Sequence, residues 1–101
     1  MDPDKPDEFN ISDVVISTAG HDRGALFYVV SMDDQFLYLA NGMDRDLGKP
    51  KRKKRRHVQK VLRSETRVAE KLISGDKVLN SELRRDLAFH AGEMQANNLG
   101  G

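Results

Sequence analysis

Residues 13–30 are the stretch that most constrains how this chain can fold. Apolar and β-branched residues crowd both ends of the stretch, a composition that favours an extended, half-buried backbone. Between those ends, Gly20 and Gly24 bracket three polar residues, the last of which is Arg23. Because glycine adopts positive φ without a Cβ clash, this pair suits a sharp reversal of the chain. The stretch therefore predicts two strands joined by a tight loop, with Arg23 at the loop tip.

Two further strands are predicted after this hairpin. The four expected strands cover residues 13–18, 25–32, Phe36–Ala40 and 55–62. The third strand ends at Asn41 and Gly42, a pair that is among the strongest short-range turn signals, and residues 44–50 are polar loop. Several short strands at close spacing predict a small barrel or sandwich, and closing a sheet on itself removes its exposed edges. We therefore expect a small β-barrel over residues 11–62.

The hairpin resembles the KOW motif, the RNA-binding hairpin of many ribosomal proteins and transcription elongation factors. The residues that match this motif are Val15, Gly20, Arg23, Gly24, Val29 and Val30. Residues 13–61, about half of the chain, resemble the SH3-like barrel of KOW-type large-subunit ribosomal proteins of the archaeal and eukaryotic type. They are also similar to small bacterial KOW domain-containing RNA-binding proteins. The resemblance implies an SH3-like β-barrel that binds RNA, with ribosomal RNA or ribosomal particles as its partner.

The pattern changes to helical spacing after residue 62. Ser64 is a candidate N-cap, apolar residues recur every three or four positions after it, and Gly75 ends that pattern. A second amphipathic helix begins near residue 80. Its apolar face consists of Leu83, Leu87, Ala91 and Met94. Helices this short are marginal alone, so residues 63–95 form a helical extension that needs the barrel, or a protein partner, to be stable. The predicted fold class is mainly β, or α+β overall.

Both ends of the chain are expected to be disordered. Residues 1–10 are rich in acid and contain two prolines, and residues 96–101 end in two glycines. The 101 residues suffice for one small domain and contain no cysteine. The sequence shows neither an apolar run long enough to span a membrane nor the pattern of a signal peptide. We therefore expect a soluble, cytoplasmic protein that is a monomer when free.

The strongest charge feature is a basic loop at residues 49–56, in which seven of the eight residues are Lys or Arg. The net charge of +1 hides this block, because acidic residues are concentrated near the N-terminus. Basic runs of this kind are typical of nucleic-acid patches, and the alternatives are a solvated loop or a localisation-like tag. The expected RNA-binding residues are Gly20, His21, Arg23, Gly24, Lys49, Lys51, Arg52, Lys53, Lys54, Arg55, Arg56 and His57. Most aromatic residues should lie in the core, with Tyr28 and Tyr38 the better candidates for stacking on bases.

The sequence shows no catalytic or metal-binding constellation. Its three histidines, His21, His57 and His90, are far apart and lack metal-ligand spacing. The pair Asp33 and Asp34 is more typical of a turn than of a metal site. We therefore expect neither an enzyme nor a cofactor. Two functions remain: an RNA-binding accessory protein of the translation apparatus, or a protein–protein interaction module of the translation or transcription machinery.

Overall fold

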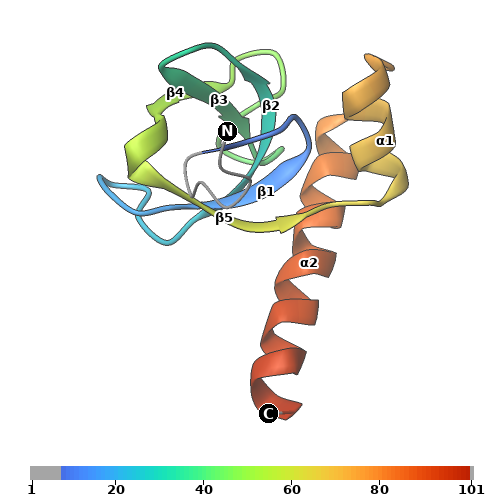
Figure 1. Ribbon diagram of the computed structural model, residues 1–101. Helices are drawn as coiled ribbons and strands as arrows, with labels where there is room; N and C mark the ends of the chain where they lie inside the picture. The colour runs from blue at the N-terminus through green and yellow to red at the C-terminus, as the bar shows by residue number, and fades with distance from the viewer. Residues whose placement is uncertain (1–7, 101) are drawn as a thin grey trace.

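Five strands and two helices make up the computed structural model, which describes residues 8–100, with side chains as far as residue 96 (Figure 1). The elements in chain order are β1 (Asp13–Ser17), β2 (Leu26–Met32), β3 (Phe36–Ala40), β4 (Lys51–Lys54), one turn of 3-10 helix (Arg55–His57), β5 (Val58–Arg63), α1 (Arg67–Ser74) and α2 (Asn80–Gly100). The predicted α+β class is confirmed, and both α-helices follow the last strand, although one 3-10 turn lies between β4 and β5. None of the helices in the described residues is long and apolar enough to cross a membrane.

The strands form one antiparallel sheet in the order β4-β3-β2-β1-β5. Irregularities in register at Val14/Val15 and at Val29/Ser31 bend the strands, as β-bulges do. The outer strands β4 and β5 pair with β3 and β1 and not with each other, so the sheet is not closed into a barrel. The 3-10 turn joins these two outer strands directly, and Figure 1 shows the sheet curled so that they lie on the same side.

Each face of the sheet carries an apolar cluster, since successive strand residues point to opposite faces. One apolar cluster fills the inside of the curl and consists of Phe9, Val15, Phe27, Val29, Leu37, Leu39 and Val58. The other lies between the sheet and the helices and includes Val14, Tyr28, Ala40, Val68, Leu83 and Leu87. The helical extension therefore packs on the sheet of its own chain. Figure 1 shows α2 continuing well beyond the edge of that sheet.

The structure changes several predicted boundaries. Phe9 is only 3% exposed and belongs to the core, so the packed domain begins before residue 11; residues 1–7 of the predicted acidic tail lie outside the described residues. The N-cap of α1 is Thr66 and not Ser64, since the Thr66 side chain accepts the Ala69 N–H, while Gly75 ends this helix as predicted. The second helix continues to Gly100, so residues 96–100, predicted to be disordered, are helical.

Candidate nucleic-acid interface

The hairpin loop between β1 and β2 has the glycine conformations that its sequence predicts. Gly20 and Gly24 have φ values of +86° and +89°, in the left-handed region that favours glycine. The Gly24 N–H donates to the carbonyl oxygen of Ser17 at 2.8 Å and closes the loop. Arg23 and His21 are exposed at its tip. The loop therefore presents a cation and an imidazole to solvent on a tightly folded backbone.

The basic block is a strand and not the loop that we predicted. Lys51 to Lys54 form β4, which pairs antiparallel with β3, and residues 55–57 form the 3-10 turn, so the expected fourth strand begins at Val58. Strand alternation then sorts the cations by face. Lys53 is buried and Lys51 is partly buried, whereas Arg52 and Lys54 are exposed. Only part of the block is therefore available to a ligand.

Asp22 of the hairpin loop holds the two inward-facing lysines. The Lys51 Nζ lies 2.6 Å from Asp22 Oδ2, and the Lys53 Nζ lies 2.6 Å from Asp22 Oδ1. Lys53 also donates to the carbonyl oxygen of Ala19 at 2.6 Å, and the Ser17 hydroxyl donates to Asp22 Oδ1 at 2.7 Å. These contacts join the hairpin loop to β4, so the two predicted RNA-binding segments lie next to each other in the fold. Sequence reasoning assigned Asp22 no role, although a lone acid between two glycines opposite a basic run was a usable signal.

The ion pairs hold Asp22 in its charged form. Burial by itself would raise the pKa of this carboxyl, but the ammonium groups of Lys51 and Lys53 and the hydroxyl of Ser17 outweigh it and hold the pKa well below its usual range. A carboxylate with a depressed pKa contributes stability above its unfolded-state pKa of 3.8 and loses that contribution as the pH falls further.

Replacing Asp22 with Asn should therefore destabilise the protein by about 2 kcal/mol at pH 7, because Lys53 would keep a charge that is nearly buried without its counter-ion. The gap between wild type and variant should narrow as the pH falls from about 5 towards 2, because Asp22 becomes protonated there in the unfolded wild-type chain while the native carboxylate stays charged. Urea unfolding across that range measures both effects. Asp34→Asn, at an exposed turn position, is the matched control. A gap that stays constant with pH would contradict the ion-pair assignment.

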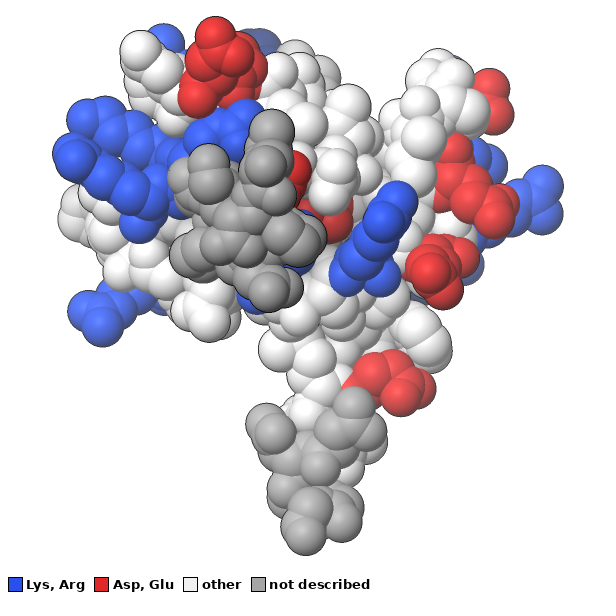
Figure 2. Space-filling view, viewed as in Figure 1, with Lys and Arg blue, Asp and Glu red and all other residues white. Residues whose placement is uncertain are grey.

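The outward face of the block consists of Arg52, Lys54 and Arg56, all exposed. Figure 2 shows Lys and Arg side chains gathered on the side of the molecule where Figure 1 places β4 and the turn after it. Among the described residues, no carboxylate lies within 4.0 Å of these three cations. The Arg52 guanidinium lies over the Phe36 ring, 4.5 Å from its centroid. Within the part of the chain that the structure describes, this face therefore combines cations that have no counter-ion with an aromatic ring.

One hollow of the surface lies beside the hairpin tip. His21, Arg23 and Lys51 line it together with Arg45, which comes from the loop after β3 and was not predicted. Lys49 is exposed in the segment before β4. His57 is partly buried, and its carbonyl oxygen accepts the Thr18 N–H at 2.9 Å, so it helps to position the loop.

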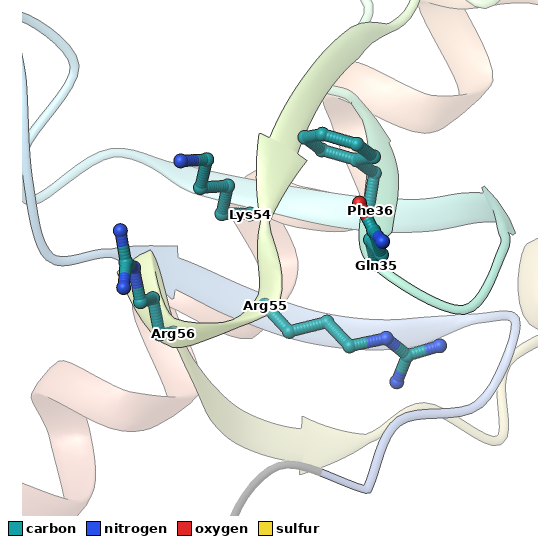
Figure 3. A pocket seen from close by; sticks show the side chains of 5 residues that line it. All are labelled: Gln35, Phe36, Lys54, Arg55 and Arg56. Carbon is teal, nitrogen blue, oxygen red and sulfur yellow. The ribbon is translucent and has the colours of Figure 1, made fainter.

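The aromatic residues differ from the prediction. Tyr28 is completely buried between the sheet and α2, so the expectation that it stacks on bases is wrong. Tyr38 is partly buried and its hydroxyl donates to Asp33 at 2.9 Å. Phe36 is partly buried and lines an open hollow between the β2–β3 turn and the 3-10 turn (Figure 3). Period-two alternation could have placed Phe36 and Tyr38 on the same face of β3.

A buried polar cluster fixes α2 to the sheet. Tyr28 donates to the carboxylate of Asp86, and its hydroxyl lies 2.8 Å from Ser64 Oγ and 3.1 Å from His90 Nε2. Thr66 also donates to Asp86, at 2.8 Å. Burial, followed by the Asp86 carboxylate, raises the pKa of the Tyr28 phenol. Ser64 and Asp86 approach the same ring nitrogen of His90, whereas a relay needs the hydroxyl on one ring nitrogen and the acid on the other. The cluster therefore fits a structural role and not a Ser-His-Asp relay.

The described residues contain no group of three or more His, Asp or Glu side chains placed to hold a metal ion. No protein-family model matches the chain, and no curated protein matches it significantly.

Proposed function

We propose that the protein binds structured RNA through the cationic face of β4 and the 3-10 turn, together with the hairpin tip. The observation that carries this proposal is the exposure of Arg52, Lys54 and Arg56 on a hydrogen-bonded strand and the turn that follows it. Cations that face solvent without a counter-ion can neutralise phosphates and release the ions condensed on RNA. Ribosomal RNA is the partner that the resemblance to KOW-type ribosomal proteins implies.

The strand geometry favours a polyanion over a single anion. Arg52 and Lys54 are two residues apart on β4, and hence about 7 Å apart along the strand, so they suit neighbouring phosphates. Arg23 reaches the same ligand from the hairpin loop, which the Asp22 ion pairs hold against β4. Arginine can also clamp a phosphate with two N–H groups, which lysine cannot do. About four phosphates are then contacted by the three cations of the face and by Arg23.

The same proposal extends to the fold family. We propose that the sheet is related to the SH3-like barrel with a KOW hairpin, in which the 3-10 turn spans the gap that β4 and β5 leave unpaired. Three features support this: the positive φ of both loop glycines, the irregularities in register that curl the sheet, and an apolar cluster enclosed on the concave side. Each is what a small sheet needs if it is to wrap around a core of its own.

A salt titration of binding to structured RNA tests the proposed function. If about four phosphates are contacted, log affinity should fall with log salt at a slope of roughly −3 to −4. Arg23→Ala should weaken binding by about 1 kcal/mol and make the slope shallower by less than one unit, since one exposed contact is lost. Co-sedimentation with ribosomal particles, at the same salt steps, then asks whether ribosomal RNA is the partner. Binding without any salt dependence would reject the proposal.

A protein-interaction role is the second candidate, and one observation favours it. Phe89 on α2 is 55% exposed and lines a hollow with Val68 of α1 and Arg85. A large exposed apolar side chain beside a hollow suits an anchor residue of a partner. If the protein co-sediments with ribosomal particles after RNase treatment, and Phe89→Ser abolishes this, a protein partner on the helices is the better account.

A further inference from the structure

The hollow between the β2–β3 turn and the 3-10 turn has a composition that the phosphate contacts do not explain. It is lined by Gln35, Phe36, Lys54, Arg55 and Arg56. Figure 3 shows Lys54 and Arg56 on one side of this hollow and the Phe36 ring on the other, with the Gln35 amide beside the ring. A phosphate needs only the cations. The aromatic ring and the amide call for a ligand that also has a flat apolar face and polar edges.

The parts of this hollow are held in place before any ligand arrives. The Asp33 carboxylate accepts the N–H groups of Gln35 and Phe36 at 2.9 and 2.8 Å, which fixes the start of β3. Arg55 Nη2 donates to the carbonyl oxygen of Asp33 at 2.6 Å and ties the 3-10 turn to the same place. The Arg52 guanidinium covers the ring of Phe36. A ligand that binds here therefore meets a prepared surface and costs little ordering.

We propose that this hollow is a subsite for one unpaired nucleobase of a single-stranded RNA segment. The base stacks on the Phe36 ring, the Gln35 amide reads its edge, and Lys54 and Arg56 bind the flanking phosphates. Aromatic and guanidinium planes are the usual stacking partners of unpaired bases, whereas a base inside a duplex has both faces covered and its edge paired. An acidic peptide would satisfy the cations but leave the ring and the amide without a partner. The inference rests on the proposed RNA binding and specifies which RNA is preferred.

The test compares a single-stranded RNA with the same strand annealed to its complement, at one salt concentration. Phe36→Leu removes the ring and keeps an apolar residue on β3, and Phe36→Tyr retains the ring as the matched control. Phe36→Leu should weaken binding of the single strand about 10-fold, the usual effect of losing one base–aromatic stack. It should leave duplex binding and the salt slope unchanged, because the ring contacts no phosphate. Phe36→Tyr should bind both RNAs with the affinity of the wild type.

A fluorescent base analogue in the single strand gives a second readout that needs no variant. Stacking on an aromatic ring lowers the fluorescence of 2-aminopurine further than stacking on the neighbouring bases does. With the analogue placed at each position of the strand in turn, wild-type protein should lower the fluorescence at one position, and Phe36→Leu should not. If Phe36→Leu binds single strands as tightly as the wild type, and the wild type quenches the fluorescence at no position of the strand, the subsite is rejected while RNA binding stands. If wild-type protein binds neither RNA, both proposals are rejected. If Phe36→Leu weakens duplex binding as much as single-strand binding, Phe36 acts through the fold and the subsite is again rejected.

Discussion

Replacing Gly42 with alanine should destabilise the protein by at least about 3 kcal/mol, the largest stability effect that we expect from one methyl group. Gly42 has a φ of +77°, which an alanine adopts only with strain. A Cβ at this position would also lie 2.2 Å from the carbonyl oxygen of Asn80 and 3.0 Å from the backbone nitrogen of Arg84. Both are backbone atoms in the first turns of α2, so neither can rotate away.

The structural consequence should be a displaced helix. The Asn80 side chain accepts the Leu47 N–H at 2.9 Å. The loop after β3 therefore contacts the start of α2 at two points, Gly42 and Leu47. Moving α2 away from Gly42 would break that bond and uncover Leu83, which is completely buried. Chemical unfolding monitored by circular dichroism measures the cost.

Two other glycines act as controls for this prediction. A Cβ at Gly48 would meet no atom within 4 Å and its φ is not positive, so Gly48→Ala should be close to neutral. A Cβ at Gly24 also has free space, but its φ is +89°, so Gly24→Ala should cost about 1–2 kcal/mol through backbone strain alone. Equal unfolding midpoints for the Gly42 and Gly48 variants would show that the loop and α2 are not in contact.

Local chemistry predicted the first three strands, because each is a run of apolar and β-branched residues that ends at a glycine or a polar turn. Strand β4 escaped prediction since Lys51 to Lys54 are all cationic and show no apolar alternation. Its extended conformation comes from pairing with β3 and from the ion pairs with Asp22, and both are long-range contacts. Phe9 was missed for a similar reason, because acidic residues and prolines surround it in the sequence.

The structure brings the predicted segments of the candidate site together and adds detail that the sequence lacked. The hairpin and the basic block do lie together, but sequence alone could not divide the block into the inward Lys51 and Lys53 and the outward Arg52 and Lys54. That division follows from strand register, which is set by the whole sheet. The buried cluster of Tyr28 and His90 was also out of reach, since these residues are 62 positions apart.

The division between inward and outward cations leads to the largest expected effect on RNA binding. Changing Arg52, Lys54 and Arg56 together to glutamine should weaken binding more than about 100-fold at moderate salt, because three phosphate contacts are lost. The salt slope should rise from roughly −3 to −4 towards about −1. The fold should persist, since these side chains are exposed and the Asp22 ion pairs with Lys51 and Lys53 are kept.

The matched control is Arg67, Lys77 and Arg85 changed together to glutamine. These residues are exposed on and between the two helices, and both variants lose the same three positive charges. If the cationic face binds RNA, the control should retain the affinity and the salt slope of the wild type. If net charge alone attracted RNA, both variants should lose affinity equally. Filter binding over a range of salt concentrations, with circular dichroism to check folding, makes this comparison. Equal loss in the two variants would mean that RNA binding is non-specific attraction to the whole molecule and that β4 has no special part in it.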